Sequence, residues 1–332
     1  MRPLWKDILT AVFMGMILPG ILLNLTVAWM HRGPEPQETA PAETAAAETA
    51  VLPMRRRNGD GSVTQMNMED YLTGVVLAEM PASFEPEALK AQAVVARTYT
   101  RKAYTTGGKH GDGSVCTDSS CCQAYISEND YLTRGGTQEG LDKVKSAVAA
   151  TSGCVLTYEG ELIEATYFSC SGGSTEDAAA VWGTDFPYLQ AVSSPGEENA
   201  AHYADTVTFT PAQFQEALGV SLSGNPESWF TITTYTEGGG VAAMTIGGES
   251  YSGTRLRALL GLRSTAFTVE ASQTEISITT RGYGHRVGMS QYGADAMAVT
   301  GSTYEEILAH YYPGTTLTQL GIDENGEAEY DN

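Results

Sequence analysis

The sequence predicts an α+β fold. Two helical stretches open the folded part, strand-like runs follow them, and the regular strand–helix alternation typical of parallel sheets does not occur. The chain has 332 residues, of which 42% are hydrophobic and 18% charged, so it can bury a large core. No internal repeat is visible.

The first segment predicts a membrane anchor. Residues 8–30, ILTAVFMGMILPGILLNLTVAWM, carry no charge and are long enough to cross a bilayer as one helix. Arg2 and Lys6 precede them, which favours a cytoplasmic stub at residues 1–7 and an extracytoplasmic body. A cleaved signal sequence is the alternative. Residues 31–58, rich in Pro, Ala, Glu and Thr, predict an extended linker.

The folded part, predicted over residues 59–322, opens with two helices. Apolar residues recur at helical spacing over 68–80, and Pro81 ends that helix. A second helix begins at Pro86 and is so rich in Ala and Val that we expect it to be buried. It carries one basic stripe, at Lys90, Arg97 and Arg101.

Further elements follow as helices and strands in irregular order. A third helix is predicted over 137–151, and a hairpin with arms 155–158 and 162–168 turns at Glu159-Gly160. Residues 206–270 hold short helices and strands, and we expect them to form an inserted subdomain.

The last part of the folded region is expected to hold one more strand and one more helix. Strand 275–280 leads into a Gly-rich loop over 281–294. A closing helix follows, with Ser302 and Glu305 spaced as a capping box. Residues 323–332 are an acidic tail.

The charge of the chain argues against two classes of binding partner. The formal net charge is −21. A field of that sign repels nucleic acid and anionic lipid, and it does not exclude a neutral polymer such as a glycan.

Glu79 is an isolated acid in the apolar run VVLAEMP. A carboxyl in an apolar setting has a raised pKa, and a protonated carboxyl is what general-acid cleavage of a glycosidic bond requires. The alternative is a helix-end glutamate that points to solvent. Arg97 is expected either to belong to a solvated basic face or to share a cleft with Glu79.

The stretch HGDGSVCTDSSCCQAY predicts a metal site. His110, Cys116 and Cys122 offer one imidazole and two thiolates in a Gly- and Ser-rich loop, which suits zinc. A fourth position is left for water or an unidentified residue, and Cys121 competes with Cys122 as the ligand. A disulfide of Cys116 with one of the later cysteines is the alternative.

Two more stretches, 167–189 and 281–296, are rich in Gly, Ser, Tyr and Trp. They suit either plain turns or a saccharide groove, where rings stack and hydroxyls hydrogen-bond. Ser290 and His285 lack a G-x-S-x-G elbow, which argues against a serine hydrolase.

Together, VVLAEMPASFEPEALKAQAVVARTYT (75–100), YFSCSGGSTEDAAAVWGTDFPYL and RGYGHRVGMSQYGADAMA resemble the stage II sporulation protein D family, lytic transglycosylases of endospore-forming bacteria. The resemblance covers about residues 60–320. It implies that Glu79 is the catalytic acid and Arg97 an arginine needed near it. The zinc pattern resembles that of clostridial members. Many relatives have STSGG where this chain has Ser169-Cys170-Ser171-Gly172-Gly173, which raises the question of a bond between Cys154 and Cys170.

The resemblance also implies a reaction and partners. The bond between N-acetylmuramic acid and N-acetylglucosamine is cleaved in strands without stem peptides, and the muramic 6-hydroxyl closes a 1,6-anhydro ring. One acid suffices for this, whereas hydrolytic glycosidases need two carboxylates. The implied location is the mother-cell membrane facing the forespore septum during engulfment, with the stage II sporulation proteins P and M. From motif position we expect the groove to be lined by Tyr167, Ser171, His285, Ser290 and Gln291.

Two rival interpretations remain open. A non-catalytic glycan-binding anchor would use the same groove without Glu79. A zinc-dependent hydrolase would activate water at the metal.

Overall fold

The computed structural model describes residues 52–322 and 328–330, and it confirms a mixed α+β architecture. The helices are α2 (Met68–Glu79), α3 (Pro86–Thr106), α4 (Glu128–Thr133), α5 (Gln138–Ala150), α6 (Ala178–Trp182), α7 (Pro211–Leu218), α8 (Gly253–Leu260), α9 (Gln291–Val299) and α10 (Tyr304–Tyr311), with 3-10 turns η1 (Gly108–His110) and η2 (Pro226–Ser228). The strands are β1 (Pro53–Arg57), β2 (Val63–Asn67), β3 (Ser114–Cys116), β4 (Cys154–Tyr158), β5 (Glu161–Leu162), β6 (Tyr167–Phe168), β7 (Gly173–Ser174), β8 (Ser193–Ser194), β9 (Ala204–Phe209), β10 (Phe230–Tyr235), β11 (Val241–Ile246), β12 (Glu249–Ser252), β13 (Ala266–Ala271), β14 (Ile276–Arg281), β15 (Met289–Ser290), β16 (Thr316–Ile322) and β17 (Ala328–Tyr330).

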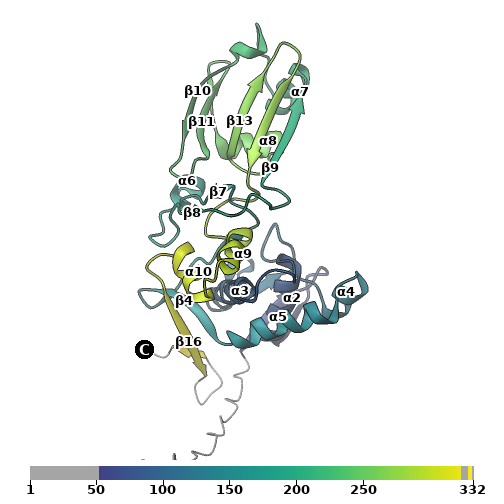
Figure 1. Ribbon diagram of the computed structural model, residues 1–332, viewed down its shortest axis with the longest axis vertical. Coiled ribbons are helices and arrows are strands. Elements are labelled where there is room, and N and C mark those ends of the chain that lie inside the picture. The colour runs from purple at the N-terminus through teal and green to yellow at the C-terminus, as the bar shows by residue number, and fades with distance from the viewer. Residues whose placement is uncertain (1–51, 323–327, 331–332) are drawn as a thin grey trace, which may run out of the picture. The chain divides into compact units, whose positions relative to one another are not determined.

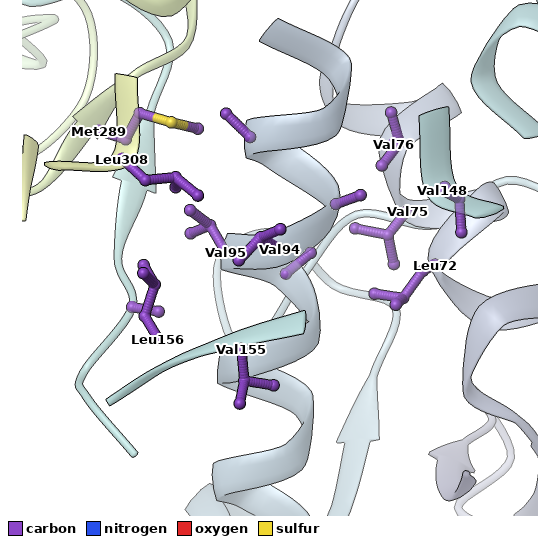
Figure 2. Close-up of a cluster of buried hydrophobic side chains, with 14 of the residues drawn as sticks. Leu72, Val75, Val76, Val94, Val95, Val148, Val155, Leu156, Met289 and Leu308 are labelled. Atoms are coloured by element: carbon purple, nitrogen blue, oxygen red, sulfur yellow. The ribbon is translucent and has the colours of Figure 1, made fainter. Parts of the chain in front are cut away.

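Helix α3 is the centre of the larger core. Its many Ala and Val side chains are small, so α2, α5, α9, α10 and β4 can all approach it closely (Figure 1). Figure 2 shows Val94 and Val95 of α3 between Val75 of α2 and Leu308 of α10. Burying each such aliphatic side chain contributes about 1.5–3 kcal/mol. The prediction that this helix is buried is confirmed.

Helix α2 ends where the sequence predicts. Its first turn is capped by Asn67, whose side chain accepts a hydrogen bond from the backbone of Glu69. Met80 already has extended dihedrals, φ −126° and ψ 144°, because the following Pro81 excludes the helical region. Glu79 is therefore the last helical residue.

The folded part begins earlier than predicted. Strand β1 lies within the expected linker, 31–58, yet it pairs antiparallel with β2 and parallel with β3. The predicted boundary at residue 59 is therefore wrong. Strand β1 ends in three arginines and follows a Pro- and Ala-rich segment, so its composition does not indicate a strand. The predicted anchor at 8–30 lies outside the described residues. Within the described part, no helix is long and apolar enough to span a bilayer.

The hairpin after α5 is confirmed at its turn and shorter than predicted in its second arm. Glu159 and Gly160 both have positive φ, 52° and 83°, as a two-residue hairpin turn requires. Strand β5 ends at Leu162, and the chain then leaves the sheet. Tyr167 and Phe168 form β6, which pairs in parallel with β15 instead. This pairing brings the two Gly-rich stretches of the sequence side by side.

The inserted subdomain is larger than residues 206–270. Its second core is built on β9–β14, α7 and α8, and the sheet order β13-β14-β9 draws in β14, residues 276–281. A buried ion pair of 2.9 Å between Arg286 and Glu176 joins it to the larger core, because Glu176 also accepts from the backbone of Gly240.

The C-terminal helices differ from the prediction in two ways. Helix α9 begins at Gln291, inside the stretch expected to be a loop. The capping box of α10 is formed by Thr303 and Glu306, one residue later than Ser302 and Glu305. Both pairs have the same spacing, so spacing alone could not choose between them.

Candidate active site

The side chain of Glu79 lines a cavity of about 690 Å³, a size typical of small-ligand sites. The loop over residues 110–122, which carries the predicted metal ligands, supplies one part of the lining. The two Gly-rich stretches, 167–189 and 281–296, supply another part. The lining residues are Glu79, Tyr99, Lys109, Ser119, Ser120, Cys121, Cys122, Gln123, Glu164, Ala165, Thr166, Tyr167, Phe168, Ser169, Trp182, Tyr283, Gly284, His285 and Gln291.

The environment of Glu79 favours its protonated form. Burial raises the pKa of this carboxyl above its ordinary value of 4.5, because the charged form loses hydration. Three hydrogen-bond donors partly oppose that rise: the backbone of Ala124, at 2.7 Å from Oε1, and the side chains of Tyr167 and Gln291. The site therefore holds a carboxyl that can keep a proton and is also prepared to carry the charge after losing it.

Tyr167, one of the three donors to Glu79, is held by a buried polar network centred on Gln123. Its amide oxygen accepts from Thr100 at 2.9 Å and from Tyr71 at 3.4 Å, and its amide nitrogen donates to the hydroxyl of Tyr167 at 3.2 Å. Burial and the charge of Glu79 raise the pKa of Tyr167, so its hydroxyl remains a donor. Sequence reasoning missed Gln123, because nothing in its neighbours indicates a buried amide.

Gly74 allows the segment that carries Ala124 to lie against α2. The backbone N–H of Ile126 donates to the carbonyl of Gly74 at 3.1 Å. A methyl group at position 74 would lie 2.6 Å from the carbonyl oxygen of Ile126 and would also overlap the ring of Tyr125. The close approach brings residue 124 to the end of α2, where its N–H meets Glu79.

Arg97 does not share the cleft with Glu79, and that part of the prediction is wrong. Its fully buried guanidinium makes a bidentate pair with Glu69, at 2.9 and 2.6 Å, and donates to the carbonyl of Cys154. Glu69 lies at the start of α2, about 15 Å along the helix from Glu79. Arg97 thus fixes the helix that carries the acid and does not line the cavity.

The predicted metal residues come together, and a fourth one joins them. The ligand atoms of His110, Cys116, Cys121 and Cys122 all lie within 4.8 Å of one another. Nε2 of His110 is 3.5 Å from the sulfur of Cys122 and 3.8 Å from that of Cys121, and the two sulfurs are 3.9 Å apart. A tetrahedral zinc ion needs edges of about 3.8 Å between sulfurs and about 3.5 Å between sulfur and nitrogen. The distances among His110, Cys121 and Cys122 fit such an ion, and Cys116 lies close enough to offer a fourth ligand.

Adjacent Cys121 and Cys122 can face one point because a tight turn precedes them. The backbone N–H groups of both cysteines donate to the carbonyl of Asp118, at 3.0 and 2.8 Å. The two cysteines are therefore not alternative ligands, because both thiols lie in the cluster.

All five cysteines are free, so neither of the two disulfides that the sequence left open is present. Cys154 donates to the side chain of Gln319, and Cys170 donates to Glu197 at 3.0 Å.

An aromatic wall faces the cavity. Trp182, 43% exposed, lies with its ring centre 5.2 Å from that of His285, which also packs edge-on against Phe168 at 5.6 Å. Burial, and secondarily the charge of Arg257, lower the pKa of His285 to about 4, so the imidazole is neutral at pH 7. Trp182 lies within the Gly-rich stretch 167–189, but only the fold shows that this side chain lines the cavity.

Of the five expected groove residues, three line the cavity and two do not. Tyr167, His285 and Gln291 are lining residues. Ser171 is fully buried, and its hydroxyl donates to Glu197 at 2.9 Å. Ser290 is buried as the N-cap of α9, where it accepts from the backbone of Gly293. Both serines were expected from motif position, which cannot distinguish a lining hydroxyl from a capping one.

A second hollow of about 270 Å³ adjoins the first and shares Tyr99, Lys109, Cys122 and Glu164 with it. Glu164 is a second carboxylate in the cavity lining. It pairs with Lys102 at 2.7 Å, and its side chain is 40% exposed.

Comparison with known proteins identifies the family. A family model described as "Stage II sporulation protein" matches residues 56–158. Stage II sporulation protein D of Bacillus subtilis (strain 168) is 42% identical over 267 residues, which cover 79% of this chain and 78% of that protein. The chain belongs to the stage II sporulation protein D family.

Other relatives agree with membership of the stage II sporulation protein D family. The protein of that name from Bacillus amyloliquefaciens is 41% identical over 79% of this chain and 77% of its own length. The "Amidase enhancer" of Bacillus subtilis is 32% identical over 74% of this chain, but the match covers 40% of that protein. The names of the two closely matching relatives connect the family with sporulation, as the sequence motifs predict.

Proposed function

We propose that this protein is a lytic transglycosylase that cleaves glycan strands of peptidoglycan from which the stem peptides have been removed. The observation that carries the proposal is the partly buried carboxyl of Glu79, with a raised pKa, in a cavity large enough for sugar rings. Family membership supports a role in wall remodelling during sporulation.

In the proposed reaction, Glu79 acts first as an acid and then as a base. It protonates the oxygen that links N-acetylmuramic acid to N-acetylglucosamine, and an oxocarbenium-like species forms. The 6-hydroxyl of the same muramic residue attacks the anomeric carbon, and the carboxylate of Glu79 takes its proton. The N–H of Ala124 and the hydroxyl of Tyr167 stabilise the carboxylate between the two steps.

The remaining walls bind the sugar. Trp182 offers an exposed ring on which a pyranose can stack, and Gln291 and neutral His285 offer hydrogen bonds. Because the attacking hydroxyl belongs to the substrate, no second carboxylate is needed for the chemistry.

We further propose that zinc binds His110, Cys116, Cys121 and Cys122 in a structural role. Four protein ligands leave no open position for water, unlike catalytic zinc sites with three. When bound, the ion holds the loop from 116 to 122, and Ala124, two residues later, donates to Glu79. This arrangement favours a supporting metal over the zinc-dependent hydrolase.

A hydrolytic glycosidase is the second candidate, because Glu164 lines the same cavity. In that reaction Glu164 would be the base that activates water, and Glu79 would be the acid. The pairing of Glu164 with Lys102 and its place beside the second hollow favour a role in the wall of the groove instead.

In the cell, we propose that residues 8–30 anchor the protein in the mother-cell membrane facing the septum, where it acts with the stage II sporulation proteins P and M. A turbidity assay on stem-free sacculi tests the activity. The wild-type protein should clear the suspension, and Glu79→Gln should not. Clearing by the Gln variant at the wild-type rate would overturn the assignment of the acid.

A further inference from the structure

Lys109 is a cation of the cavity that the proposed reaction does not use. Among the described residues lining the cavity, it alone is a lysine or arginine. The other basic group there, His285, is neutral at pH 7 because burial lowers its pKa to about 4. Lys109 also lines the second hollow, so it lies where the two meet.

The ammonium group of Lys109 is held by a hydrogen bond to the backbone and has no carboxylate partner among the described residues. Its Nζ donates to the backbone carbonyl of Cys121. No ion pair to Lys109 is found among residues 52–322, whereas Lys102, which also lines the second hollow, is paired with Glu164 at 2.7 Å. An ammonium has three donors, so two remain for a ligand.

The charge of the protein makes this cation informative. The chain carries a formal net charge of −21. A glycan strand without stem peptides is itself an anion, because each muramic residue then ends in a free lactyl carboxylate. The two repel one another except where a local cation offsets the field. With the stem peptide attached, that carboxyl is a neutral amide and cannot pair with an ammonium.

We propose that Lys109 binds the lactyl carboxylate of a muramic residue in the cavity and thereby selects strands whose stem peptides have been removed. This inference rests on the proposed function and assigns a specificity-determining residue to it. The carboxylate takes two hydrogen bonds from the ammonium, while the third holds Lys109 to the carbonyl of Cys121.

Binding by an inactive protein tests this without any chemistry. In a Glu79→Gln background, we would compare Lys109 with Lys109→Gln and Lys109→Arg. Gln keeps a donor for the Cys121 carbonyl and removes the charge, and Arg keeps the charge. The ligands are stem-free strands and the same strands after carbodiimide coupling with methylamine, which turns each carboxylate into a neutral amide. Dissociation constants are measured by calorimetry at two salt concentrations.

The expected result is a preference of about two- to fivefold for the carboxylate strands with Lys109, as one ion pair of an exposed ammonium contributes. Lys109→Gln should bind both strands equally, and Lys109→Arg should keep most of the preference. Lys145→Ala is the matched control, since it removes one charge from the exposed pair with Glu128, and Lys145 does not line the cavity. It should leave the preference unchanged.

Several outcomes would overturn the inference. They are a metal-loaded Lys109→Gln protein that keeps the preference, no preference with Lys109 present, or an equal loss in Lys145→Ala. Metal content is measured for every variant because Lys109 adjoins His110. The proposed function fails separately, if the active protein leaves no anhydro ends on stem-free strands, so the two failures are distinguishable.

Discussion

Oε1 of Glu79 accepts a hydrogen bond of 2.7 Å from the backbone N–H of Ala124, two residues after the metal-pattern cysteine Cys122. This contact joins the end of a buried helix to a loop that the sequence marks for metal binding. It explains how a metal cluster can matter to a carboxyl that is not among its ligands.

Replacing Glu79 by Gln should lower the rate of strand cleavage by about 100-fold to 10,000-fold, the usual contribution of a general acid. The amide is nearly the same size, so folding should be unaffected. Glu164→Gln is the control and should retain most of the activity. If Glu164→Gln were inactive and Glu79→Gln active, the roles of the two carboxyls would be reversed. Release of soluble fragments measures both.

The activity and the stability should both fall as the pH rises. In the proposed reaction Glu79 must carry a proton, and its folded pKa lies above the ordinary value of 4.5. Between 4.5 and that folded pKa, the unfolded chain loses the proton and the folded protein keeps it, so the free energy of unfolding decreases with pH. Below 4.5 both states are protonated and the effect vanishes. The free energy of unfolding is measured with urea at several pH values in this window, for the wild type and for Glu79→Gln. The Gln variant should lack this pH-dependent contribution. An identical dependence of the free energy of unfolding on pH in the two proteins would contradict the prediction.

Cys121→Ser should weaken metal binding as strongly as Cys122→Ser does, since both thiols lie in the cluster. Loading with Co²⁺ gives a direct measurement, because a tetrahedral site with three thiolates has strong charge-transfer and ligand-field absorption. A Cys121→Ser protein with unchanged affinity and spectrum would show that the fourth ligand is another group. Chelation should reduce cleavage by releasing the loop before Ala124, and metal should restore it.

Gly74→Ala should reduce stability by about 1–3 kcal/mol, although Ala is normally the better helix former. The added methyl would overlap the 125–126 segment and push Ala124 away from Glu79. Activity should therefore fall with stability. Gly59→Ala is the control, because an added methyl there meets nothing within 4 Å. Thermal unfolding and cleavage rates are the measurements, and a fully active, more stable Gly74→Ala protein would refute the packing argument.

Arg97→Met should destabilise the fold by about 3–5 kcal/mol, because it leaves Glu69 charged and unpaired in a largely buried site. The double variant with Glu69→Leu removes both charges and should recover much of that loss. If Arg97 only positions α2, the double variant should also regain activity per folded molecule. A folded but inactive double variant would restore Arg97 to the chemistry.

The sequence predicted the features that depend on local pattern. The period of α2, the Pro81 stop and the Ala- and Val-rich α3 all follow from spacing and backbone restriction, and the Glu159-Gly160 turn follows from residue type. The isolation of Glu79 in an apolar run also identifies it as a candidate acid from the sequence alone.

What the sequence could not predict depends on pairing across the chain. From the sequence, Arg97 could be a cleft residue or a solvated one. Only the packing of α2 against α3 shows that its guanidinium pairs with the carboxylate of Glu69. Ser171 is withdrawn from the groove because Glu197, 26 residues away, accepts its hydroxyl. Cys121 lies in the metal cluster because the chain turns at Asp118, and the residues around Asp118 do not predict that turn.

The product of the reaction tests the central claim most directly. Stem-free glycan strands are digested with the purified protein, and the new chain ends are analysed by mass spectrometry. Proton transfer from Glu79 with capture by the substrate's own hydroxyl predicts 1,6-anhydro-muramic ends, each lighter by one water than a reducing end. Reducing ends in their place would mean that water is the nucleophile and would contradict the account.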